Sequence, residues 1–320
     1  DGWRFEVKTG KLSKAEEDAL KKGTIGRSDG GTCSLTGASM PFSYIREEGQ
    51  TNGLGVRLMA VVAEGNRSRV YLSPTDNHVT AAESARPAWE PEGELPNNPR
   101  DFKTPNYGMR TFASLFTPRQ LVALTTFSDL VAEARERVLA DARTVSLHGP
   151  TSGAAEGSDG YETPLHQGGT GPTAYADAVA TYLAFALSKC LDRNNSLTNW
   201  EAGMGRMGHL FSRHAVPMVW DFTEGNIFAG SGGDFYGTVH SLCKPLERLV
   251  PSSSASIAQI NAAKNGFPVR PIVVSTDPPY YDNIGYADLS DFFYIWLRNS
   301  VGSLWPDLFR RLTTPKAEEL

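Results

Sequence analysis

The chain has 320 residues, 40% of them hydrophobic and 21% charged, so it can bury a substantial core and lacks the composition of a disordered protein. No stretch approaches 18 consecutive apolar residues, which excludes a membrane-spanning helix. The net charge of −5 excludes a simple basic nucleic-acid coat protein. It leaves a DNA enzyme open, because only the face that contacts DNA must be positive.

The cysteines are few and widely separated. Cys33, Cys190 and Cys243 form no C-x-x-C pair, which argues against a disulfide scaffold and against an intact cysteine-based zinc site. The start of the chain lacks the basic-then-apolar pattern of a secretory signal. These features predict a cytoplasmic protein with no membrane contact.

Residues 1–110 are expected to form a small β-rich segment that ends in a proline-rich connection. A capping-box pattern, Ser-x-x-Glu, predicts a short helix over 13–22. Apolar runs at 56–62 and 69–72 flank a turn sequence and predict a hairpin. Prolines recur over 86–105, where they exclude regular elements and predict an extended connection.

Residues 111–215 are expected to form a helical insertion, which is a candidate for target recognition by its position. A Thr-Pro start and helical apolar spacing predict a helix over 117–142. Similar spacing predicts a second helix over 173–190 and a third over 200–214, the latter weakened by three glycines. The Gly-, Ser- and Thr-rich stretch 147–171 predicts a loop.

Residues 216–320 show strands that alternate with helices. A short apolar strand is predicted at 217–220, and a helix over 235–249. A β-branched run at 271–276 is typical of a fully buried strand, and a helix over 288–299 follows it. This alternation predicts an α/β fold with a parallel sheet.

The sharpest feature is an Asp-Pro-Pro-Tyr tetrapeptide directly after the predicted buried strand. Ligands of open parallel sheets bind beyond the carboxyl ends of strands. The Asp277 carboxylate and the Pro278 carbonyl can each accept one N–H of a planar exocyclic amine, while Pro279 stiffens the corner and Tyr280 stacks on the attached ring. A base in a duplex must be flipped out to reach such a corner. The alternative is an ordinary turn, since Asp and Pro are common turn residues.

This tetrapeptide resembles the catalytic motif of amino-group methyltransferases that use S-adenosylmethionine. The longer run 275–294, together with 217–228 and 315–320, is similar to large bacterial adenine-specific DNA methylases that carry an embedded zinc-ribbon-like segment. The resemblance implies a partial Rossmann-like methyltransferase sheet in 216–320. It also implies methyl transfer to N6 of adenine in DNA. In this reading, contacts to the target strand or closure of the pocket are expected from Tyr281, Asp282 and Asn283.

The chain departs from that family at the ribbon. Cys33 is followed by Ser-Leu-Thr-Gly, with no second thiolate, whereas a zinc site needs four ligands. A metal-free relic of a ribbon is therefore expected, and no metal site. His209 and His214 are five positions apart without carboxylate or cysteine companions, so they are interpreted as ordinary surface or core histidines.

A second departure concerns the cofactor. The family's F-x-G-x-G loop lies upstream of the matched region, and no such loop follows a strand near this N-terminus, so an internal piece of a longer protein is expected. Phe228, Gly230 and Gly232 fit the loop pattern before a predicted helix, although a flexible segment is the alternative. Asn261 follows a possible strand at 256–260 and is a weaker cofactor candidate, with a plain loop residue as its alternative.

The expected function is that of an adenine-specific DNA methyltransferase that uses S-adenosylmethionine, acts on DNA, and works with other subunits of a restriction or phage-defence system. Two rivals stay open. An RNA or protein-glutamine methyltransferase needs only a planar amine at the same corner. The other is a non-catalytic DNA-binding fragment that lacks its cofactor loop.

Overall fold

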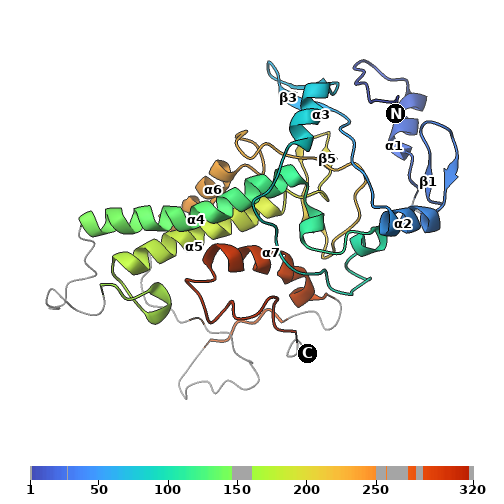
Figure 1. The fold of residues 1–320 in the computed structure, drawn as a ribbon. Coiled ribbons are helices and arrows are strands. Elements are labelled where there is room, and N and C mark those ends of the chain that lie inside the picture. Colours follow the sequence, from blue (N-terminus) through green and yellow to red (C-terminus); the bar gives the residue numbers. More distant parts are fainter. Residues whose placement is uncertain are drawn as a thin grey trace.

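The computed structural model describes residues 2–26, 28–145, 161–249, 257, 273–278 and 284–316 (Figure 1). Within these ranges the protein is mixed α/β, with helices and small antiparallel sheets. The helices are α1 (Lys14–Lys22), α2 (Phe42–Thr51), α3 (Asp76–Glu83), α4 (Pro118–Thr144), α5 (Pro172–Leu191), α6 (Phe235–Arg248) and α7 (Tyr286–Val301). The strands are β1 (Gly31–Thr32), β2 (Ser39–Met40), β3 (Val61–Glu64), β4 (Arg69–Leu72), β5 (Trp200–Glu201) and β6 (Arg206–Met207).

Local capping chemistry sets the N-terminal helices. Ser13 and Glu16 form the predicted capping box of α1, in which each side chain bonds the other residue's backbone N–H. The predicted hairpin is also confirmed, with Val61 of β3 opposite Leu72 of β4. Helices α2 and α3 were not predicted from the sequence, although α3 carries its own N-cap, Thr75.

Three long helices form the body of the molecule. Figure 1 shows α4 and α5 side by side with α7 close to both, and contacts join all three pairs. The predicted Thr117 cap of α4 is confirmed, because its hydroxyl accepts the Gln120 N–H. The predictions of helices at α5, α6 and α7 are confirmed as well. Buried polar contacts set their register, such as Ser128 Oγ of α4 at 2.8 Å from Ser300 Oγ of α7.

Aromatic rings fill the centre of this body. Phe116 stacks on Phe292 of α7 with ring centroids 5.7 Å apart, and it meets Trp296 edge-on at 5.4 Å. Trp89, in the proline-rich connection, also contacts Trp296, with ring centroids 5.6 Å apart. The same buried cluster contains residues from each of the three expected segments, so one core joins them: Leu95, Phe102, Leu124, Leu187, Leu210, Val216, Phe292 and Trp296.

The prediction of a third helix over 200–214 is wrong. Residues 200–207 instead form a tight hairpin, in which Trp200 of β5 pairs with Met207 of β6. Gly205 has a φ of +61°, a left-handed conformation that glycine adopts without strain. Glycine also weakens helices by roughly 1 kcal/mol per residue, so the glycines here favour the turn.

The predictions of strands at 217–220 and 271–276 are also wrong for the residues that the structure describes. Residues 217–220 belong to no strand, although the preceding Val216 makes an isolated parallel bridge with Phe102. Residues 273–276 are irregular, and Val273 is 99% exposed. A β-branched run becomes a buried strand only where neighbouring strands cover it. The named sheets of the described residues are all two-stranded, antiparallel and elsewhere in the chain.

None of the helices described here combines the length and the apolar character needed to cross a membrane.

The substitution Trp296→Ala should lower the free energy of unfolding by about 3–5 kcal/mol, because it empties the space that Phe116 and Trp89 enclose. Urea unfolding followed by circular dichroism measures this loss. The matched control is Tyr236→Ala, at a side chain that is 81% exposed, which should change the free energy by about 0.5 kcal/mol or less. Equal effects of both substitutions would contradict the aromatic core.

Candidate functional site

The structure describes only the first half of the Asp-Pro-Pro-Tyr motif. Asp277 and Pro278 lie on irregular, solvent-exposed backbone. The Asp277 carboxylate is therefore accessible, rather than enclosed at the end of a sheet. Several candidate residues lie outside the described residues, namely Pro279, Tyr280, Tyr281, Asp282, Asn283 and Asn261.

The chain is anchored again a few residues after the motif, where α7 begins. Lys316 Nζ lies 2.5 Å from Asp288 Oδ1 and 2.7 Å from Asp291 Oδ2. The Asp291 side chain is only 1% exposed, and it also accepts the backbone N–H of Thr314 at 2.7 Å. A buried carboxylate needs such partners to stay charged, so Lys316 and Thr314 tie the end of the described chain to α7.

The proline-rich connection contributes to the same place. Asn98 Nδ2 donates to Asp288 Oδ2 at 3.1 Å and to Asp101 Oδ2 at 3.0 Å. Gly285 lies so close that a Cβ there would be 3.1 Å from Asn98 Nδ2 and 3.2 Å from Asp101 Oδ2. A side chain at this position would therefore have to displace the Asn98 amide and the Asp101 carboxylate by a few tenths of an ångström. We refer to these polar residues as the α7 cluster: Asn98, Asp101, Asp288, Asp291 and Lys316.

Sequence analysis did not single out the α7 cluster. The only local signal is the i, i+3 spacing of Asp288 and Asp291, which places both on one side of a helix. Their partners come from positions 98–101 and 314–316, far away in the sequence. The cluster fixes the backbone on the C-terminal side of the motif.

The F-x-G-x-G candidate forms a loop that leads into α6. Phe228 is exposed and its ring lies 5.8 Å from that of Phe127. Gly230 has a φ of +64° and open space where a Cβ would stand, while a Cβ on Gly232 would lie 3.5 Å from the Arg193 guanidinium. The loop backbone is thus open to an approaching ligand at Gly230.

The start of α6 is already occupied by a carboxylate of this chain. Asp234 is the N-cap, and its Oδ2 accepts the Gly237 N–H at 3.2 Å. A helix N-terminus attracts anions through such free N–H groups. Because Asp234 supplies the negative charge itself, the carboxylate of a ligand's methionine end would be repelled there. The start of α6 is therefore unsuited to the carboxylate of S-adenosylmethionine.

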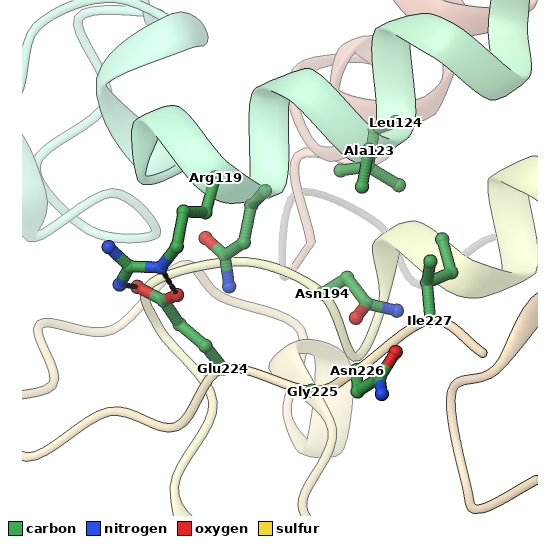
Figure 2. Close-up of a pocket in the computed structure, with 9 residues that line it drawn as sticks. Arg119, Ala123, Leu124, Asn194, Glu224, Gly225, Asn226 and Ile227 are labelled. Atoms are coloured by element: carbon green, nitrogen blue, oxygen red, sulfur yellow. Dashed lines mark hydrogen bonds and ion pairs between the residues drawn. The ribbon is translucent and has the colours of Figure 1, made fainter. Parts of the chain in front are cut away.

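A cavity of about 240 Å³ lies between α4 and the residues that precede this loop (Figure 2). At its rim Arg119 Nε donates to Glu224 Oε2 at 2.7 Å, and Nη2 donates to Oε1 at 2.5 Å. Asn194 and Asn226 add amide groups, and Leu124 and Ala123 of α4 form an apolar wall. The paired rim charges cancel, so this cavity suits a small neutral polar group rather than an anion.

Cys33 opens the turn between β1 and β2. Its N–H donates to the Ala38 carbonyl at 2.8 Å, and its carbonyl accepts the Gly37 N–H at 2.9 Å. Hydrogen bonds from the Thr36 hydroxyl, the Thr36 N–H and the Leu35 N–H lower the pKa of the Cys33 thiol. In the part of the chain that the structure describes, no group of three or more His, Cys, Asp and Glu side chains could hold a metal ion.

His209 lies between charged partners, with Nδ1 2.5 Å from Asp192 Oδ2 and Nε2 2.5 Å from Arg193 Nη2. His214 is exposed on a neighbouring bend. The contacts of His209 fix the segment after β6 to the end of α5.

Comparisons with protein-family models, curated proteins and solved structures gave no match to this chain.

The three cysteines should differ in the rate at which their thiols are alkylated. At pH 8, iodoacetamide should modify Cys33 faster than the exposed Cys243, because the lowered pKa leaves more thiolate. Burial raises the pKa of Cys190 to about 11, so Cys190 should react only after unfolding. Peptide mass spectrometry over time gives the three rates. Thr36→Val should slow the modification of Cys33 several-fold. Fast labelling of Cys190 in the folded protein would contradict the packing of α5.

Lys316→Met should destabilise the protein by about 1–3 kcal/mol at pH 7, since it leaves Asp291 buried without its cation; the lysine is 39% exposed, so solvent screening favours the lower end. Burial acts to lower the pKa of Lys316, but the hydrogen bonds and charges of Asp288 and Asp291 outweigh it and hold that pKa above the ordinary 10.5.

Because the folded-state pKa is raised, the contribution of Lys316 is fully present below pH 10.5 and is lost as the pH rises through the higher folded-state value. Urea unfolding at pH 7 and above pH 11 should show the difference between wild type and Lys316→Met shrinking. Lys316→Arg should behave like wild type at pH 7. A pH-independent difference would show that the charge of Lys316 is not what stabilises α7.

Proposed function

We propose that this chain is the catalytic portion of an adenine-specific DNA methyltransferase that uses S-adenosylmethionine. The Asp-Pro-Pro-Tyr motif upstream of α7 carries the proposal, and the exposure of Asp277 supports it, because a flipped base must reach this carboxylate. The α7 cluster supports it further by fixing the chain just beyond the motif. The proposal includes a partial Rossmann-like methyltransferase fold.

In the proposed reaction the Asp277 carboxylate and the Pro278 carbonyl each accept a hydrogen bond from one N–H of the adenine amino group. These two hydrogen bonds hold the amino nitrogen toward the methyl donor. Pro279 stiffens the corner and Tyr280 stacks on the base. The new C–N bond forms as the C–S bond of the sulfonium breaks, and the bonding electron pair stays on sulfur. The methylated amine then releases one proton to water.

The methyl donor is a substrate of this reaction, and its site is the least defined part of the proposal. Phe228, Gly230 and Gly232 offer an open backbone, but the Asp234 cap disfavours the donor's carboxylate at α6. We therefore assign no step to this loop. Asn261 stays a weaker candidate for the donor's adenine ring.

DNA is the proposed partner, in a cytoplasmic restriction or phage-defence setting with other subunits. A planar amine is also present in RNA bases and in glutamine side chains, so competition among DNA, RNA and peptide substrates separates these classes. Binding of DNA without binding of S-adenosylmethionine would favour the non-catalytic rival.

The purified chain should bind S-adenosylmethionine in a calorimetric titration and transfer tritiated methyl groups to adenine-containing duplex DNA. Asp277→Ala should lower methylation by about 10²-fold or more, because the amine loses a group that holds it, while binding of S-adenosylmethionine stays unchanged. Asp18→Ala, at an exposed carboxylate of α1, is the matched control and should keep wild-type activity.

Circular dichroism of both variants confirms that the fold is intact. Wild-type activity in Asp277→Ala would overturn the assignment of the motif. A folded chain that neither binds S-adenosylmethionine nor methylates any of the three substrate classes would contradict catalysis by this chain alone.

A further inference from the structure

A groove with aromatic walls lies between α2 and residues 217–220, with a cavity of about 410 Å³. Three rings and two cations line it, and we call it the aromatic groove. These side chains are Phe42 and Arg46 of α2, Lys103 and Tyr107 of the connection, and Trp220. None of the described residues that line it is acidic.

The rings are arranged as a stacking surface. Tyr107 is buried and meets Trp220 edge-on, with centroids 5.1 Å apart and planes at 83°. Trp220 is 37% exposed, so one part of its ring is supported by protein while another faces solvent. Arg46 lies 5.7 Å from the Phe42 ring and 5.8 Å from the Tyr107 ring, and these cation–π contacts hold its guanidinium at the groove.

Close backbone packing makes the groove rigid. A Cβ on Gly49 of α2 would lie 2.5 Å from the Tyr107 carbonyl oxygen, so only glycine permits this approach. Gln50 Nε2 also donates to the Asn106 carbonyl at 2.9 Å. The opposite wall is held where the Lys103 N–H donates to the Val216 carbonyl at 3.0 Å.

The charge of the groove is local and positive, although the chain carries a net charge of −5. Arg46 contacts rings, and Lys103 Nζ donates to the backbone carbonyl of Pro99 at 2.5 Å. Phosphates can therefore approach these cations without displacing a carboxylate among the described lining residues. Rings beside unneutralised cations match the base and the phosphate of a nucleotide.

The groove is also connected to the proposed catalytic region. Residues 98–107 bring Asn98 and Asp101 to the α7 cluster at one end, and Lys103 and Tyr107 to the groove at the other. One short segment thus joins the groove to the structure that fixes the chain after Asp277.

We propose that the aromatic groove binds an unpaired segment of a DNA strand, with one base stacked on Trp220 and adjoining phosphates on Arg46 and Lys103. The choice of DNA as the occupant rests on the function proposed above. An unpaired segment is specified because neighbouring base pairs cover both faces of a base inside a duplex, which leaves none for Trp220.

Fluorescence anisotropy with a labelled twelve-nucleotide single-stranded DNA tests this without S-adenosylmethionine. Arg46→Gln and Lys103→Gln should each weaken binding several-fold and reduce the salt slope by about 0.7, the value for one phosphate contact on a single strand. Trp220→Leu should weaken binding about 5- to 100-fold with an unchanged salt slope, because stacking is worth about 1–3 kcal/mol per base.

Matched controls come from α6, which lies apart from α2 in Figure 1. Lys244→Gln and Tyr236→Leu remove an exposed cation and an exposed ring there, and both should bind like wild type. Circular dichroism excludes unfolding of any variant.

Equal binding by the groove variants and wild type, or no binding of the oligonucleotide, would overturn the proposal. So would a mononucleotide that binds as tightly as the twelve-nucleotide strand, since it would assign the groove to a free nucleotide. This test measures binding and not methylation. It can therefore succeed or fail independently of the methylation assay that tests Asp277.

Discussion

The structure depends on the aromatic packing of α7 against Phe116. Phe292 and Trp296 cover Phe116 from two directions, and Trp89 encloses Trp296 from the proline-rich connection. Large rings bury more apolar area per residue than any aliphatic side chain, so a few of them can hold together segments distant in sequence. This contact holds α7 and the proline-rich connection against the residue just before α4.

Everything proposed about function lies at the edges of that core. At one edge the α7 cluster holds the chain that follows Asp277, and at another the bridge between Phe102 and Val216 holds the wall of the aromatic groove. Both edges use the connection over 98–107, whose prolines restrict the backbone. A proline-rich stretch is therefore a structural support of both candidate regions.

Electrostatics divide the candidate sites by ligand type. The groove presents two cations without a lining carboxylate, whereas the cavity beside α4 neutralises Arg119 with Glu224. The start of α6 carries the charge of Asp234. Of these three places, the groove has the charge that suits an anionic strand, and such a local charge is compatible with a net charge of −5 for the whole chain.

The sequence by itself determined the elements whose signals are local. The capping box at Ser13, the Thr-Pro start at Thr117 and the helical spacing of α4, α5 and α7 depend on residues within a few turns, and these predictions are confirmed. Long-range partners decided the rest. A β-branched run such as 273–276 becomes a buried strand only if distant strands cover it, and here it is exposed. The α7 cluster and the aromatic groove likewise exist only because the fold brings positions 98–107 to residues near 216 and 288, a pairing that no local pattern encodes.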